Sequence, residues 1–323
     1  MVRRQRFFRG QLVEVRSSAE IAATLDANGK LDGVPFMPEM ARYCGHRVRV
    51  FRRAEKTCVA GAGLRHLRST VFLEALRCDG AFHDGCQRNC LFFWKEAWLK
   101  PVEDRAAPSQ ADAHPDRATS LWISQLPTRQ GGKYSCQSTE LLAATEPLSR
   151  WNFVPFIREI FHGELSVRVF AEIVYRAVAH RFFGWKDPGN LAGTEGKKIK
   201  GDLDLRAGEW VKVKNAEEIQ AHLDAEGINC GLAFRPSMAE AIGGRYQVAF
   251  PVQRIIVEQT GKMVHLKNTV ALKGVVCEGV CAANCPRAEY LYWRESWLRR
   301  VHAGTEAEYA TRDASRSGAC SPH

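Results

Sequence analysis

Two stretches of this chain, RCDGAFHDGCQRNCLFFWKEAWL at residues 77–99 and VCEGVCAANCPRAEYLYWRESWL at residues 276–298, follow one pattern. Each begins with two cysteines that are eight residues apart and ends on Trp-x-Glu-x-Trp-Leu. A pattern of this length that recurs at a constant offset of 199 residues indicates an internal duplication. We therefore expect two copies of one small domain, each with a cysteine cluster just ahead of a Trp-x-Glu-x-Trp strand.

The duplication extends well before the cysteines. Residues 10–50 align with residues 208–248 at an offset of 198, and the offset becomes 199 from His66 onward, after a one-residue insertion. Residues shared in the first part are Gly10, Val13, Val15, Glu20, Ile21, Leu25, Asp26, Gly29, Gly33, Phe36, Pro38, Met40, Gly45, Arg47 and Val50. Glycines, apolar residues and acidic residues recur alike, so the whole scaffold is repeated.

Each copy contains the same succession of predicted elements. An alternating strand comes first, at 11–17 and 209–215. A helix should follow, because Ser17 and Glu20 form a capping box in sequence. Asn215 and Glu218 lack the Ser or Thr of that motif but are placed to cap a helix in the same way. Further strands are predicted at 47–53, 69–76 and 94–99, and at 245–252, 268–275 and 293–298. Short strands, one helix and glycine-marked turns predict a small, strongly bent β-barrel.

The succession of Gly, an alternating Val-x-Val strand and a strand that closes on Trp resembles SH3-like barrels. The resemblance implies binding modules, although a fold by itself is weak evidence for function. The fold class that we expect is mainly β with α: two small SH3-like barrel modules joined by a helical middle segment. The expected ranges are 8–103 for the first module with its Cys cluster, 104–132 for a linker, 133–187 for the helical segment, 188–207 for a second linker, 208–302 for the second module with its Cys cluster, and 303–323 for a disordered tail.

The middle segment contains two helical patterns, at 149–163 and 164–185. In the second, apolar residues recur on one side at helical spacing. They are Val167, Phe170, Val174, Ala177 and Val178. We expect a helical pair that packs between or against the barrels; the alternative is a basic amphipathic helix on a membrane surface.

The whole layout also resembles an uncharacterised bacterial two-repeat family. The residues that carry this resemblance are YSCQSTEL around Cys136, RCDG around Cys78, and CPRAEYLYWRESWL from Cys285 to Leu298. The resemblance spans most of the chain. It implies the domain layout and carries no activity.

Composition bounds the class of protein. The 323 residues are 45% hydrophobic and 10% aromatic, which suffices for packed cores. A net charge of +10 permits binding to nucleic acid, but the basic residues are spread along the chain, which favours an ordinary basic surface. The N-terminus has no apolar signal region, so we expect a cytoplasmic protein. In a reducing compartment, eleven cysteines are more typical of metal ligands than of disulfides.

The first cluster predicts a structural zinc site. Its candidate ligands are Cys58, Cys78, His83, Cys86 and Cys90. Four thiolates, or three thiolates and the His83 imidazole, suit tetrahedral zinc. Unliganded thiols and a redox role stay open as alternatives.

The second cluster offers Cys277, Cys281 and Cys285. A fourth ligand would come from His265, Cys230 or Cys136, which would complete a second structural zinc site. Alternatively, three ligands and an open position would make a catalytic metal centre. Iron–sulfur ligation is a further alternative, because the spacing does not select between the two kinds of site.

Three other features are candidate sites. On a strand, Trp94, Glu96 and Trp98 would share one face, as would Trp293, Glu295 and Trp297. Such a face either binds a cation or belongs to the core. Cys136 is a candidate reactive thiol, although no base is partnered with it in sequence. The first functional hypothesis is a zinc-stabilised tandem SH3-like binding or adaptor protein with a protein partner. A metal- or thiol-dependent enzyme built on the second cluster and Cys136 is the second, and nucleic-acid binding is the third.

Overall fold

The computed structural model describes residues 6–102, 117–149, 152, 154–183, 189–193, 203–279 and 284–301. The predicted disordered tail at 303–323 and the first part of the predicted linker, 104–116, lie outside these residues. The chain forms two compact units that do not follow the boundary between the two copies. Unit 1 comprises Met1–Lys186, Arg254–Leu266 and Val276–Tyr290; unit 2 comprises Asp187–Gln253, Lys267–Val275 and Leu291–His323. Two pieces of the second copy therefore belong with the first.

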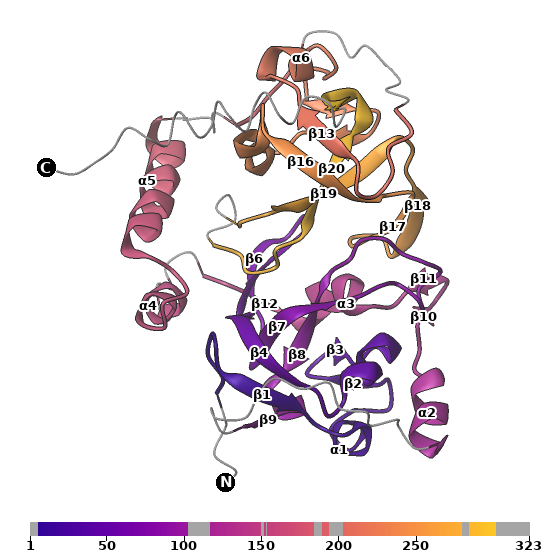
Figure 1. Cartoon of the computed structure of the whole chain (residues 1–323). Coiled ribbons are helices and arrows are strands. Elements are labelled where there is room, and N and C mark those ends of the chain that lie inside the picture. Colours follow the sequence, from indigo (N-terminus) through magenta and orange to yellow (C-terminus); the bar gives the residue numbers. More distant parts are fainter. Residues whose placement is uncertain are drawn as a thin grey trace, which may run out of the picture. The chain divides into compact units, whose positions relative to one another are not determined.

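The first copy is built on one curled antiparallel sheet of five strands (Figure 1). Its strands are β1 (Leu12–Val15), β4 (Arg47–Arg53), β7 (Thr70–Arg77), β8 (Leu91–Lys95) and β9 (Leu99–Pro101). They lie in the order β8-β7-β4-β1-β9. A register shift within β4, where it pairs with β7, marks a bulge that bends the sheet into half a barrel.

The second copy repeats this sheet strand for strand. Its strands are β13 (Trp210–Val213), β16 (Arg245–Pro251), β19 (Thr269–Val276), β20 (Tyr290–Arg294) and β21 (Leu298–Arg300), in the order β20-β19-β16-β13-β21. The register shift recurs at the equivalent place in β16. Two repeated β modules are thus present, as the duplication predicts.

Both predicted capping boxes are present. Helix α1 (Ser18–Ala22) follows Ser17, and α6 (Ala216–Gln220) follows Asn215; in each, the capping side chain and the Glu three residues later bond each other's backbone. A short hairpin and a 3-10 helix then lead to the second strand of the sheet. They are β2 (Lys30–Leu31), β3 (Val34–Pro35) and η1 (Pro38–Tyr43) in the first copy, and β14 (Ile228–Asn229), β15 (Leu232–Ala233) and η3 (Pro236–Ala241) in the second.

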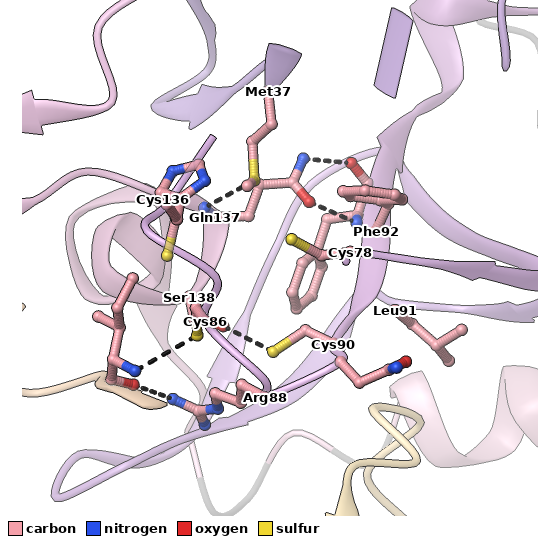
Figure 2. Close-up of a pocket in the computed structure, with 14 residues that line it drawn as sticks. Met37, Cys78, Cys86, Arg88, Cys90, Leu91, Phe92, Cys136, Gln137 and Ser138 are labelled. Atoms are coloured by element: carbon pink, nitrogen blue, oxygen red, sulfur yellow. Dashed lines mark hydrogen bonds between the residues drawn. The ribbon is translucent and has the colours of Figure 1, made fainter. Parts of the chain in front are cut away.

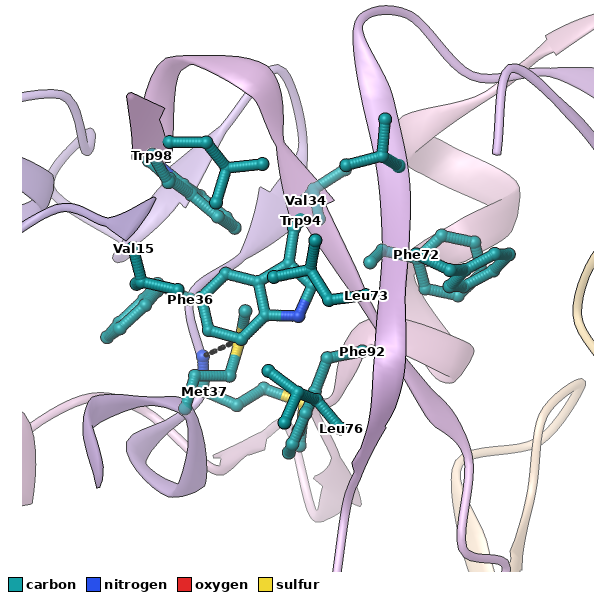
Figure 3. Packing of buried hydrophobic residues seen from close by; sticks show 14 of the residues in the cluster. Val15, Val34, Phe36, Met37, Phe72, Leu73, Leu76, Phe92, Trp94 and Trp98 are labelled. Carbon is teal, nitrogen blue, oxygen red and sulfur yellow. Dashed lines mark hydrogen bonds between the residues drawn. The ribbon is translucent and has the colours of Figure 1, made fainter. Parts of the chain in front are cut away.

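The Trp-x-Glu-x-Trp stretch is not one strand, contrary to the expectation. Strand β8 ends at Lys95, and Glu96–Trp98 forms a 3-10 helix, η2, before β9. Residues Glu295–Trp297 form the equivalent helix η5. The turn lets both indoles of a copy point into one core, where Trp94 and Trp98 are fully buried near Phe36 (Figure 3).

Each copy also carries a hairpin between its second and third sheet strands. In the first copy it consists of β5 (Lys56–Val59) and β6 (Gly63–His66); in the second, of β17 (Arg254–Val257) and β18 (Lys262–His265). The register aligns Cys58 with Ile256, and the one-residue insertion lies in the hairpin turn.

The segment between the copies is more ordered than the sequence indicates. Helix α2 (Arg117–Ser124) lies within the predicted linker and packs on the first core through Ile123 and, just beyond the helix, Leu126. The stretch before the helix is rich in Ala, Pro and Ser, which led to the prediction of a linker. Next come α3 (Gln137–Ala144), α4 (Val154–Phe161), α5 (Val167–Phe183) and the short strands β10 (Arg129–Gln130), β11 (Lys133–Tyr134) and β12 (Glu146–Pro147).

The apolar side of α5 is not packed as expected. Val167 is 67% exposed, and Val174 and Val178 are also exposed. Helix α4 does contact the first copy, because Lys56 of β5 binds Glu159 at 2.8 Å and lies over the Phe156 ring, but Val154 and Phe161 are exposed. Within the described residues, no helix combines the length and the apolar character needed to cross a bilayer.

Candidate metal centre

Four cysteines of unit 1 line one small cavity (Figure 2). Cys78 follows β7, Cys86 and Cys90 lie in the loop before β8, and Cys136 directly precedes α3. Three of them were predicted as ligands of the first cluster. The fourth, Cys136, stands 46 residues beyond Cys90 in sequence; it was predicted as a reactive thiol or as the missing ligand of the second cluster, not as a ligand of the first.

The residue after Cys136 holds it at the cavity. The Gln137 side chain donates to the Phe93 and Pro35 carbonyls at 2.9 and 3.0 Å and accepts from the Phe93 amide at 2.8 Å. These bonds tie the first turn of α3 to β8 and β3. Cys136 is the N-cap of α3 and donates its own amide to Thr139, which leaves its thiol directed to the cavity (Figure 2).

A glycine shapes the cysteine loop in each copy. Gly80 has φ +71°, and a Cβ there would lie 2.2 Å from the carbonyl oxygen of Cys86. Gly279 has φ +76° and the same relation to Cys285. No side chain fits this turn, which folds the loop back so that the Cys78 amide donates to the Cys90 carbonyl at 2.8 Å. Cysteines eight and twelve residues apart are thereby brought to one place.

Burial sets the protonation of these thiols. It raises the pKa of Cys78, Cys86, Cys90 and Cys136 above the ordinary value. The Glu39 carboxylate adds to the effect at Cys78, whose sulfur lies 3.9 Å from it. Without a bound cation, the four groups are therefore neutral thiols at neutral pH.

His83, the alternative ligand of the first cluster, already has both ring nitrogens bonded. Nδ1 lies 2.8 Å from Glu39 Oε1, and Nε2 lies 3.1 Å from the Ser135 carbonyl oxygen. Burial disfavours the imidazolium, but the bond to the Glu39 carboxylate outweighs it, so the pKa of His83 is raised. With both ring nitrogens facing oxygen atoms, His83 turns neither of them to a metal in this arrangement.

Cys58 lies elsewhere, with the second cluster. Its sulfur is 3.2 Å from that of Cys285, and its amide donates to Cys285 Sγ at 3.2 Å. In the same way, the Ile256 amide donates to Cys86 Sγ at 3.3 Å. Since Ile256 is the equivalent of Cys58, the relation is reciprocal: the hairpin of each copy lies against the cysteine loop of the other.

An ionic network accompanies these two contacts. Arg287 donates to the Cys58 carbonyl at 2.7 Å, and its equivalent Arg88 lies 3.5 Å from the Ile256 carbonyl. Both arginines bind the buried carboxylate of Glu258, at 2.7 and 2.9 Å. Each arginine is the one charged residue of its stretch, QRN at 87–89 and PRA at 286–288, so sequence reasoning missed Glu258, Arg88 and Arg287.

The remaining candidates of the second cluster are Cys281, His265, Cys230 and Cys277. Cys281 is outside the described residues, and His265 is exposed at the end of β18. Cys230 is exposed in the turn between β14 and β15. Cys277 repeats the fold of Cys78, donating its amide to the Glu289 carbonyl at 2.7 Å. Over the part of the chain that the structure describes, no three His, Cys, Asp or Glu side chains stand in an arrangement that holds a metal ion as it is.

The Trp-Glu-Trp candidates belong to the two cores. The Glu96 carboxylate accepts from the Phe7 amide at 2.9 Å and from Arg53 at 2.7 Å. Glu295 accepts from the amides of residues 203–205. In both copies this carboxylate ties the segment before the first strand to the sheet.

Comparison with known proteins adds no family to this geometry. No protein-family model, no curated protein and no solved structure matches the chain.

Proposed function

We propose that this chain is a zinc-stabilised tandem SH3-like binding protein whose partner is another protein. The observation that carries the zinc is the gathering of Cys78, Cys86, Cys90 and Cys136 around one cavity of about 30 Å³. A space of this size accepts an ion or a water molecule. It is about ten times too small for a metabolite, whose pockets are roughly 300–1,000 Å³.

The donor set suits structural zinc. Four thiolates close the tetrahedral shell at about 2.3 Å from the ion and leave no position for a substrate. Each cysteine has one side-chain torsion, and rotation about it would have to bring the four sulfurs within reach of one ion. Zinc would also displace the thiol protons, which relieves the cost of ionising buried sulfur. Bound there, the ion would tie the loop between β7 and β8 to α3.

The SH3-like assignment is supported by the order of the strands. In each copy the first strand pairs with the last, the second to fourth strands form a meander, and a 3-10 turn separates the last two strands. SH3-like barrels are built in this order. The segment between β1 and β4, with its own hairpin, occupies the place of their long first loop.

A protein partner is supported by the surface of the middle segment. On α5, exposed apolar side chains recur at intervals of four, three, four and four residues: Val167, Ala171, Val174, Val178 and Phe182. The spacing is that of a helix face which packs on another helix. These apolar side chains have no charge with which to bind the phosphates of nucleic acid, so the face favours a protein as the partner.

Zinc content tests the proposal and decides between two ligand sets. We expect one zinc per chain in the purified wild type, the same in Cys230→Ser, and none in Cys136→Ser. Cys58→Ser should keep the ion. If the four-thiolate set predicted from sequence were correct, this variant would lose the ion, because that set includes Cys58. Zinc-free wild type that is folded, or full zinc in Cys136→Ser, would contradict the proposal.

A further inference from the structure

In unit 1, the sulfur atoms of Cys58 and Cys285 lie 3.2 Å apart. Cys58 lies on β5 and is partly exposed; Cys285 is 3% exposed and lies in the cysteine loop of the second copy. A disulfide needs about 2.05 Å, so a shift of roughly 1 Å would close it. Sulfurs that share a tetrahedral zinc ion are farther apart, about 3.7 Å from the Zn–S length.

The two sulfurs have different surroundings. The hydrogen bond shared with the Cys58 thiol, the amides of Cys58 and Arg287, which donate to the Cys285 sulfur, and the Arg287 charge lower the pKa of Cys285 despite its burial. The proton shared with Cys285, together with burial, raises the pKa of Cys58. One sulfur is therefore the nucleophile of the pair and the other keeps the proton.

We propose that Cys58 and Cys285 form a reversible disulfide when a small peroxide reaches them. The Cys285 thiolate attacks one peroxide oxygen, the O–O bond breaks, and the departing hydroxide becomes water with the proton released by the pair. Cys58 then attacks the resulting Cys285 sulfenic acid, the S–S bond forms and a second water leaves. Two thiols are oxidised by two electrons, and one hydrogen peroxide is reduced to two waters.

This site is confined to one of the two reciprocal contacts. At the other, Ile256 stands where Cys58 does, so Cys86 has no thiol facing it from the hairpin. Oxidation would therefore bond the hairpin of the first copy to the loop of the second and leave the opposite pair free. The inference stands apart from the zinc proposal, because neither thiol lines the four-cysteine cavity.

The test is stoichiometric oxidation of the reduced full-length protein with hydrogen peroxide, followed by thiol blocking and peptide mapping. We expect a Cys58–Cys285 cross-link in the wild type and in Cys230→Ser, reversed by dithiothreitol. Cys58→Ser should instead accumulate sulfenic acid at Cys285, trapped by dimedone, and Cys285→Ser should give neither product. Zinc content should be equal in all four proteins.

Two results would overturn the proposal. One is complete alkylation of both thiols after peroxide treatment of protein that is still folded by circular dichroism. The other is loss of a zinc ion in both Cys58→Ser and Cys285→Ser, which would make the pair metal ligands instead.

Discussion

Arg88 and Arg287, which stand at equivalent positions of the two copies, bind the same carboxylate, that of Glu258. Glu258 has no acidic counterpart in the first copy, where Ala60 takes its place and donates its amide to Glu258 at 3.0 Å. One carboxylate thus serves both halves of a repeated contact. The side chains of Glu258, Arg88 and Arg287 are buried or partly buried, and their network joins the two hairpins and the two cysteine loops inside unit 1.

Glu258→Ala should destabilise unit 1 strongly. Breaking a buried ion pair costs about 3–5 kcal/mol. We expect the lower end, about 3 kcal/mol, because Glu289 still contacts both arginines at 2.9 and 2.6 Å. The free energy of unfolding in urea measures this. The matched control is Glu146→Ala, which removes the exposed pair Arg68–Glu146 and should cost about 1 kcal/mol or less. Equal losses in the two variants would refute the network's role.

The two indoles of the first core should differ in their sensitivity to the same substitution. Trp98 Nε1 donates to Thr24 Oγ1 at 3.0 Å, whereas the buried Nε1 of Trp94 has no hydrogen-bond partner among the residues that the structure describes. Both side chains are fully buried, so Trp98→Phe and Trp94→Phe remove similar volume. The lost hydrogen bond should make Trp98→Phe costlier by about 1 kcal/mol. Thermal unfolding of the two variants side by side checks the order, and the reverse order would contradict it.

Two carboxyl groups, the buried Glu164 and the partly buried Glu14, should give opposite pH dependences. Burial raises the pKa of Glu164, although it accepts from the Arg53 amide. The hydrogen bond from Lys100 is the main cause that lowers the pKa of Glu14. The folded state therefore holds the Glu164 proton more tightly than the unfolded state, and stability from Glu164 falls as pH rises from 4.5 through the raised pKa. Glu14 contributes stability above pH 4.5 that is lost as pH falls through its lowered pKa.

Urea midpoints between pH 3 and 8 would show these trends against the glutamine variants. As pH rises, the urea midpoint of Glu164→Gln should increase relative to that of the wild type. As pH rises through the acidic part of the range, the midpoint of Glu14→Gln should decrease relative to that of the wild type. Parallel curves for both variants would mean that neither group is shifted.

Removal of zinc should loosen a defined region. If the ion ties the loop between β7 and β8 to α3, a chelator should speed amide hydrogen exchange in residues 78–90 and 137–144 before it affects β13 and β16 of unit 2. Uniform acceleration across both units, or none in the loop, would contradict this assignment. Cys136→Ser should show the same local pattern without a chelator.

The sequence predicted the repeated parts of this molecule well, and the physical reason is local. Strand alternation, the Ser17–Glu20 and Asn215–Glu218 caps and the glycine turns act within a few residues, so they are visible in the chain itself. The error at Glu96–Trp98 is instructive. Alternation of Trp and Glu imitates a strand, but the backbone turns there so that two indoles share one core.

The ligand sets could not be predicted, because they depend on which segments meet. Cys58 was grouped with Cys78 by its nearness in sequence, yet its strand faces the loop of Cys285. Cys136 was considered as a lone thiol or as a ligand of the second cluster, yet the bonds of Gln137 bring it to the cavity of Cys78. Gln137 makes three hydrogen bonds in the core, two with Phe93 and one with Pro35, and nothing in the local sequence indicates them. Only contacts across 44 and 102 residues reveal them.

The reciprocal placement of hairpins and cysteine loops has a consequence for the origin of the chain. In a single-copy ancestor, one domain could not present its hairpin to a loop in another copy of itself. Such an ancestor could make both contacts only as a pair of identical chains with twofold symmetry. Fusion of two genes would have preserved that pair in one polypeptide and freed the halves to diverge, which is how Glu258 could arise once and serve both arginines.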